Sequence, residues 1–205
     1  MPDPIALGFD TSAAHCAAAL LRGDRVLGQA AEEMTKGQAE RLFPLLEGLL
    51  ADAGLSWRDL DVIGVGIGPG NFTGIRIAVA AARGLALSLG IPAVGVTATE
   101  AAAFGLPRPC RVVLPLRADQ VVWQDFGGPD SSPRQAQADM LPPGPAPLMA
   151  TIPPAVAIAR IALERRTGPG PRPARPRRPA RPDRCQLFRM GRRSRSIFPD
   201  RLADH

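Results

Sequence analysis

The chain has 205 residues, 45% of them hydrophobic, and a formal net charge of +6 at pH 7. This length allows one sizeable core or two small domains, and we expect neither a membrane span nor a secretory signal. From Arg165 onward there are thirteen arginines and three aspartates, whereas residues 1–164 carry twelve basic and sixteen acidic side chains. The net charge is therefore no argument that the body of the chain binds nucleic acid.

Three widely spaced cysteines form no CxxC pair, which favours reduced thiols and a cytoplasmic protein over a disulfide framework or a zinc site.

The first elements predicted are a strand and a hairpin. Residues 5–9 form a short apolar run that ends at Asp10, and the runs 16–21 and 26–31 flank a glycine-containing turn. A carboxylate in this place has two interpretations. It could position a metal–phosphate complex, or it could cap its own loop by accepting backbone N–H groups.

Residues 38–53 have leucines at helical spacing, and Gly54 stands where a C′ glycine belongs. Pro44 removes one backbone donor, so we expect a kink there or a regular helix only after it. Ser56 and Asp59 have the spacing of a capping box for a short turn before the next strand.

The stretch 62–89 predicts a strand, a glycine turn and a helix. The run 62–68 is apolar, with glycines where another backbone or a ligand comes close. Pro69 and Gly70 fit a type II turn with positive φ at the glycine, and Asn71 and Thr73 are both able to cap the helix that follows.

Such a turn could hold a phosphate, because it directs N–H groups and the helix dipole at one point. The cofactor-binding candidates are Asp10, Gly68, Gly70 and Thr73. The stretch matches neither the P-loop pattern nor GxGxxG. A tight turn that lets strand and helix pack closely is an equally good interpretation.

The remaining pattern predicts a strand at 91–96, a helix at 99–104, strands at 111–116 and 120–126, and a last helix at 155–166. Helices alternating with strands indicate an α/β layered architecture.

Few residues are available for catalysis. The chain has two histidines, His15 and His205, one lysine and no tyrosine. Spacing implies no partner for His15, and no catalytic or metal-ligating residues are assigned.

The motifs LGFDTS, KGQAERLFPLLEGLL and VGIGPGNFTGIRIAVAAARGLALSLGIPAVGVT resemble the TsaB (YeaZ) family, and PLRADQVVWQDF resembles the start of that family's second subdomain. The resemblance implies an actin-like ATPase (ribonuclease H-like) fold with two related subdomains, the second truncated or altered. We expect an N-terminal subdomain at 1–105, an incomplete C-terminal subdomain at 106–166 and an Arg/Pro-rich tail at 167–205.

The resemblance also implies a function. TsaB is the non-catalytic subunit that supports TsaD when a threonylcarbamoyl group is transferred to the tRNA adenosine beside the anticodon. The implied partners are a TsaD-like catalytic subunit, a TsaE-like ATPase and, through the complex, tRNA; the same face could pair with itself when the partner is absent. No tightly bound cofactor is expected, and ATP is used by the partners. The alternative is a small ATPase or phosphotransferase of the same fold, or a peptidase-like protein.

Two helices are expected to form the partner interface as a small bundle. Small residues at i, i+4 spacing and an excess of apolar residues favour this assignment. The predicted contacts are Glu40, Arg41, Phe43 and Leu45 on the helix 38–53, and Gly74, Ala78, Ala82 and Ala86 on the helix after residue 74.

The tail does not resemble the end of the family. Its Arg/Pro-rich composition predicts disorder. Out-of-frame translation of a GC-rich gene and a functional polybasic extension are both open explanations.

Overall fold

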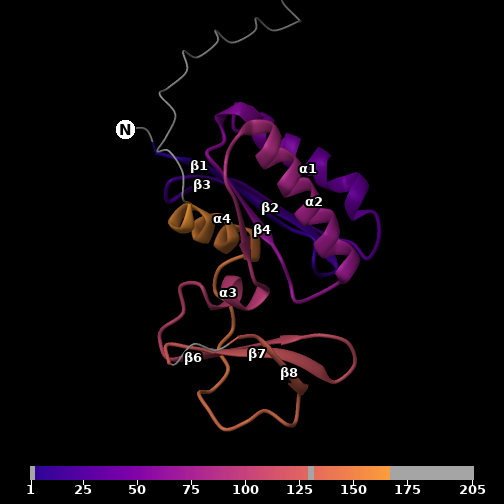
Figure 1. Ribbon diagram of the computed structural model, residues 1–205, viewed down its shortest axis with the longest axis vertical. Coiled ribbons are helices and arrows are strands. Elements are labelled where there is room, and N and C mark those ends of the chain that lie inside the picture. Colours follow the sequence, from indigo (N-terminus) through magenta and orange to yellow (C-terminus); the bar gives the residue numbers. More distant parts are fainter. Residues whose placement is uncertain (1–2, 129–131, 167–205) are drawn as a thin grey trace, which may run out of the picture. The chain divides into compact units, whose positions relative to one another are not determined.

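The computed structural model describes residues 3–128 and 132–166, whose strands form two sheets (Figure 1). The predicted disordered tail, 167–205, lies outside the described residues. In chain order the elements are β1 (Ile5–Asp10), β2 (His15–Arg22), β3 (Arg25–Glu33), α1 (Gln38–Asp52), the 3-10 turn η1 (Trp57–Asp59), β4 (Val62–Gly66), α2 (Phe72–Leu89), β5 (Ala93–Val96), α3 (Ala98–Ala103), β6 (Cys110–Pro115), β7 (Gln120–Phe126), β8 (Arg134–Gln137) and α4 (Pro154–Arg165).

The larger sheet has the strand order β3-β2-β1-β4-β5. Its first three strands are antiparallel neighbours, whereas β4 and β5 run parallel to β1. The antiparallel part contains the predicted hairpin, with Gly23 in its turn at φ 53°. The parallel part requires helical crossovers, which α1 and α2 supply. β1 lies in the centre and is buried along its whole length.

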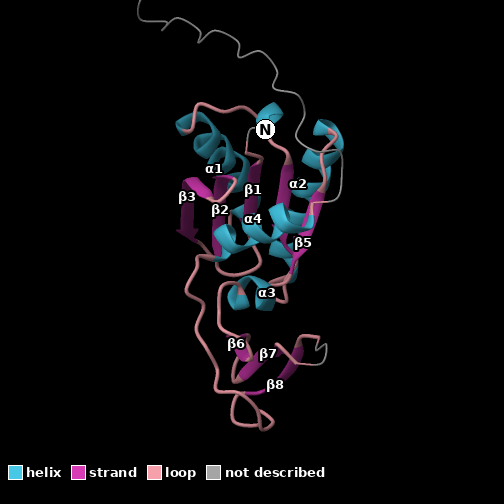
Figure 2. Ribbon diagram, turned by 90° about the vertical axis from the view of Figure 1, so that its left-hand side faces the viewer, coloured by secondary structure: helices cyan, strands magenta, loops and turns pink. Residues whose placement is uncertain are grey.

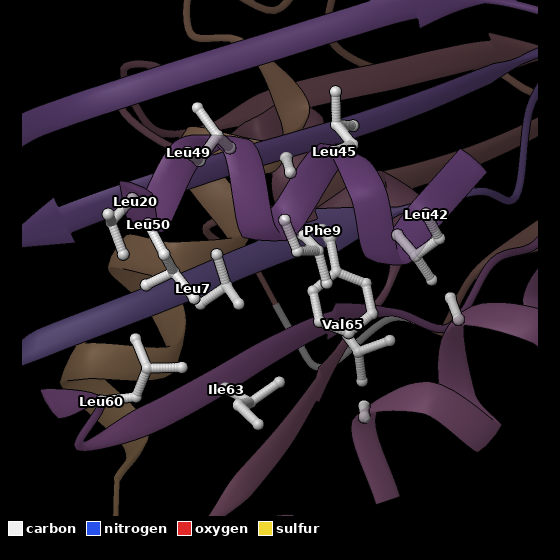
Figure 3. Close-up of a cluster of buried hydrophobic side chains, with 14 of the residues drawn as sticks. Leu7, Phe9, Leu20, Leu42, Leu45, Leu49, Leu50, Leu60, Ile63 and Val65 are labelled. Atoms are coloured by element: carbon white, nitrogen blue, oxygen red, sulfur yellow. The ribbon is translucent and has the colours of Figure 1, made fainter. Parts of the chain in front are cut away.

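Helices α1 and α2 cover one face of this sheet (Figure 1). Leucines of α1 that recur every three or four residues point to the strands, as the sequence predicts. Figure 3 shows them against Leu7, Phe9 and Leu20, which are all fully buried. Burial of each such side chain stabilises the fold by roughly 1.5–3 kcal/mol.

Helix α4 covers the opposite face of the sheet (Figure 2). A Cβ on Gly8 would lie 2.5 Å from the carbonyl oxygen of Ala155, and one on Gly64 would lie 2.7 Å from that of Ile158. The glycines of β1 and β4 therefore let the helix backbone approach the strands. Close approach of another backbone was one of the two explanations for the glycines of 62–68. The last predicted helix thus exists, and it packs on the first sheet.

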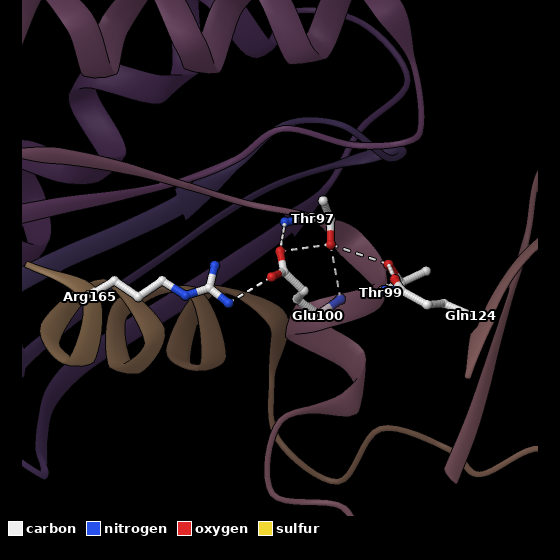
Figure 4. A network of polar contacts seen from close by, with 5 residues as sticks. All are labelled: Thr97, Thr99, Glu100, Gln124 and Arg165. Carbon is white, nitrogen blue, oxygen red and sulfur yellow. Dashed lines mark hydrogen bonds and ion pairs between the residues drawn. The ribbon is translucent and has the colours of Figure 1, made fainter. Parts of the chain in front are cut away.

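Helix α3 connects this layer to the antiparallel sheet β6-β7-β8. Thr97 caps α3 in a reciprocal capping box with Glu100. Figure 4 shows that Glu100 also binds Arg165 at the end of α4, 2.6 Å away, while Thr99 donates to Gln124 of β7 at 2.6 Å. Polar contacts of α3 therefore reach both α4 and the smaller sheet.

Three local predictions differ from the structure. Strand β8 was not expected, because its four residues follow a Pro/Gly-rich stretch without alternation. Helix α1 runs through Pro44, so the alternative of a regular helix only after the proline is wrong; Pro44 leaves the carbonyl of Glu40 without its helical hydrogen bond. In the turn before α2, the positive φ belongs to Gly68 (78°) and not to Gly70, so the predicted type II turn is wrong.

Candidate functional site

Helix α1 has an exposed aromatic residue beside its buried leucines. Phe43 is 42% exposed, and its ring contacts Trp57, with 6.2 Å between the ring centroids. Of the other predicted contacts on α1, Glu40 and Arg41 are exposed, and Arg41 forms a bidentate pair with Glu32 of β3.

Leu45, in contrast, belongs to the core. Only 6% of it is exposed, because it lies one turn before Leu49 on the side of α1 that faces the sheet. The prediction that Leu45 is an exposed partner contact is therefore wrong.

The predicted ridge of small residues on α2 faces the sheet as well. Gly74, Ala78 and Ala82 are buried, and a Cβ on Gly74 would collide with the carbonyl oxygen of Thr11. Ala86 is half-buried and packs against the same core. Small residues do permit close approach here, but the neighbour is the chain's own core. The assignment of Gly74, Ala78 and Ala82 to the partner face is therefore wrong, whereas that of Ala86 stays a prediction.

A neighbouring ridge on α2 points to solvent. Ala80, Gly84 and Ser88 are exposed at i, i+4 spacing, and a Cβ on Gly84 would meet no atom within 4 Å. This ridge was missed because three short side chains carry little hydrophobic signal, although the helical glycine was visible in the sequence.

An open apolar groove lies between α1 and α2. Its volume is about 460 Å³. The lining residues are Ala39, Leu42 and Phe43 from α1, and Ile77, Ala80, Ala81, Gly84, Leu85 and Ser88 from α2. Serine is the only polar type among them, so the groove offers a partner an almost wholly apolar surface.

Helix α2 has the length and hydropathy of a membrane span, contrary to our expectation that the chain contains no such segment. Its 18 residues have a mean hydropathy of 1.4, and 17% of them are buried. Three small residues of this helix are buried against the core, and its side chains Ile77 and Leu85 line the groove beside α1. Contact with another protein would cover the exposed apolar area of α2 as well as a membrane would.

The second candidate site lies around Asp10 at the end of β1. Asp10 is buried and accepts hydrogen bonds from the backbone N–H of Ser12 at 3.1 Å and from Ser12 Oγ at 3.0 Å. Its Oδ2 also lies 3.0 Å from Nε2 of His15. Of the two interpretations of this carboxylate, the structure shows the loop cap.

The spacing of residues along the sequence did not predict the contact between Asp10 and His15. The antiparallel pairing of β1 and β2 brings the two residues together across a short connection. Within residues 3–128 and 132–166, no three His, Cys, Asp or Glu side chains form a group able to hold a metal ion.

The glycine turn before α2 packs against the same loop. The N–H of Asn71 donates to the carbonyl oxygen of Ser12 at 2.6 Å, and a Cβ on Gly70 would collide with that oxygen. The side chain of Asn71 accepts from the N–H groups of Thr73 and Gly74, so it is the helix cap as predicted.

Several donors that a phosphate would need at this helix start are thus already bound within the chain. Asp10, Gly68 and Gly70 lie together around these two loops, whereas Thr73 is exposed at the start of α2.

Comparisons with known proteins agree with this architecture. A family model described as "TsaD: tRNA N6-adenosine threonylcarbamoyltransferase" matches residues 26–124, which include α1 and α2. An uncharacterized protein of Mycobacterium tuberculosis is 33% identical over 169 residues, which cover 80% of each chain. The structure of YeaZ from Pseudomonas aeruginosa superposes with a TM-score of 0.64 at 27% identity, covering 78% of this chain and 90% of that one. The chain belongs to the TsaB (YeaZ) family.

This membership gives the chain the actin-like ATPase fold of the ribonuclease H-like type. A TsaB-named relative, the tRNA threonylcarbamoyladenosine biosynthesis protein of Bacillus subtilis, is 39% identical over 97 residues. Those residues are 47% of this chain and 42% of the relative, so the likeness to that TsaB protein covers less than half of each chain.

Proposed function

We propose that this chain is a non-catalytic scaffold subunit in tRNA threonylcarbamoyladenosine biosynthesis, which docks a TsaD-like catalytic subunit on its α1–α2 groove. TsaB-named relatives support the pathway, and the TsaD-type family model supports a partner of related fold.

The open groove is the observation that carries the docking surface. An apolar depression between two surface helices is able to accept the side chains of a third helix. The exposed ridge of Ala80, Gly84 and Ser88 lets that helix come close, because the distance between helix axes depends on side-chain size at the contact. Phe43 lies at the edge of the groove and is the aromatic anchor of this surface.

The scaffold role is favoured over the ATPase alternative by the hydrogen bonds around Asp10. Its carboxylate oxygens accept from Ser12, and the N–H groups of Thr73 and Gly74 in the first turn of α2 are bound to the side chain of Asn71. ATP binding by the isolated chain would have to break these contacts. In the proposed complex the ATP is used by a TsaE-like partner, and tRNA is reached through the complex in the cytoplasm.

A bulky residue in the groove tests the proposal. The Cβ that Gly84→Leu adds would meet no atom within 4 Å, so we expect folding to be retained while the rest of the side chain fills the groove. Gly48 also has an open surrounding, but on α1 and outside the groove, so Gly48→Leu is the matched control.

Both variants and the wild type are titrated with the TsaD-like protein by calorimetry, after circular dichroism has confirmed folding. We expect Gly84→Leu to bind at least 100-fold more weakly and Gly48→Leu to bind as the wild type does. Equal binding of all three proteins would place the interface elsewhere.

Catalysis is tested by reconstitution. We expect no threonylcarbamoyl transfer and no ATP turnover by the chain alone, and transfer to tRNA when TsaD-like and TsaE-like proteins are added. ATP turnover by the isolated chain that disappears in Asp10→Asn would show that the scaffold assignment is wrong.

A further inference from the structure

The two helices that border the groove carry charges of opposite sign. Helix α1 has three acidic residues and one arginine, whereas α2 has two arginines and no acidic residue. The arginine of α1, Arg41, is bound to Glu32 of β3. The charges left without an ion-pair partner on the described helices are therefore acidic on α1 and basic on α2.

Helical geometry places these charges beside the groove. Glu47 lies one turn after Phe43, and Arg83 lies three residues after Ala80, so both are adjacent to lining residues. Glu40 and Arg76 occupy equivalent positions two turns earlier. All four are exposed, and none of them forms an ion pair within the described part of the chain.

We propose that this polarity fixes the orientation of the docked partner, whose surface is basic over α1 and acidic over α2. This inference rests on the proposed function. Because the TsaD-type family model spans both α1 and α2, a TsaD-like partner has counterparts of both helices. Two helix pairs can stack with each helix over its own counterpart or over the other one. Because the exposed charges are acidic on α1 and basic on α2, like charges disfavour one arrangement and opposite charges favour the other.

A charge exchange tests the polarity without altering the net charge. The variant carries Glu47→Arg together with Arg83→Glu, so only the sign of each rim changes. The matched control carries Glu47→Gln and Arg83→Gln, which removes the charges but introduces no repulsion. Binding to the TsaD-like protein is measured at about 0.05 M and 1 M salt, where screening is weak and strong respectively.

At low salt we expect the exchanged variant to bind at least tenfold more weakly than the wild type, with the neutral variant between them. The differences should shrink severalfold at 1 M salt. Binding of the exchanged variant within twofold of the wild type at low salt would overturn the inference.

The variant Gly84→Leu distinguishes a failure of the polarity inference from a failure of the proposed docking site. If Gly84→Leu abolishes binding while the exchanged variant binds normally, the docking site stands and the polarity inference is wrong. If neither variant changes binding, both are wrong.

Sedimentation of the chain alone tests a second copy as the occupant. In a homodimer of the exchanged variant both copies carry the exchanged charges, so α1 of one copy remains complementary to α2 of the other. A homodimer that persists in the exchanged variant, with unchanged affinity for the TsaD-like protein, would assign these charges to self-association and overturn the inference.

Discussion

The hydroxyl of Thr11 donates a hydrogen bond of 2.7 Å to the carbonyl oxygen of Gly74, which ties the loop after β1 to the first turn of α2. The same contact brings the backbone of Thr11 so close that no side chain fits on Gly74.

Gly74→Ala should therefore destabilise the chain, although alanine is the better helix former. The added methyl group would collide with backbone that cannot turn away, and we expect a loss of about 2–3 kcal/mol. Gly48→Ala is the control, since its Cβ meets no atom within 4 Å; it should gain up to about 1 kcal/mol. Urea unfolding of both variants measures the difference, and equal stabilities would contradict the packing described for α2.

Phe43 and Leu45 should separate binding from folding. Leu45→Ala removes a buried side chain and should cost about 2–5 kcal/mol of unfolding free energy. Phe43→Ala truncates an exposed residue, so its stability should change by about 1 kcal/mol or less, yet its affinity for the TsaD-like protein should fall at least tenfold. Unfolding and titration of each variant would show the reverse pattern if Leu45 were the contact.

The ion pair of Arg111 and Asp125 should support the smaller sheet. Arg111 is buried, binds both carboxylate oxygens of Asp125 and donates to the carbonyl oxygens of Pro142 and Pro143. Asp125→Asn leaves this arginine without its counter-charge, and we expect a loss of about 3 kcal/mol. Thermal unfolding measures it, and an unchanged melting temperature would show that the pair contributes nothing net.

The same pair should make stability depend on acid. The hydrogen bond from Arg111 holds the pKa of Asp125 below its ordinary value of 3.8. The ionised carboxylate therefore contributes stability that is complete above its pKa in the unfolded chain. This contribution is lost as the pH falls through its pKa in the folded chain. Between about pH 5 and pH 2, the wild type should therefore lose more unfolding free energy than Asp125→Asn does. Parallel acid titrations of the two proteins would contradict this origin.

Cys16 should be inert in the folded chain. Burial is the main cause that raises its pKa to about 11, and the Glu32 carboxylate adds to it. Because this pKa is raised, the contribution of the protonated thiol to folding stability is complete below its pKa in the unfolded chain. That contribution is lost as the pH rises through its pKa in the folded chain. Iodoacetamide at pH 8 should modify Cys16 only after urea is added, as followed by mass spectrometry. Rapid modification without urea would show that the thiol is accessible.

The sequence predicted the elements whose signals are local. The leucine period of α1, the Asn71 cap and the Ser56–Asp59 capping box are all present. It could not decide which side of α2 faces the sheet, because small residues occupy two adjacent ridges of that helix. The partners of Asp10 and the contact between α4 and the first sheet depend on tertiary pairing, which spacing along the chain does not contain.

The interlocking of α4 with Gly8 and Gly64 has a consequence for synthesis in the cell. β1 is among the first described elements to leave the ribosome, whereas residues 154–165 are the last. At ordinary translation rates this separates them by roughly 7–30 s. During that interval one apolar face of the nascent sheet has no cover, so this face is where a chaperone would engage the growing chain.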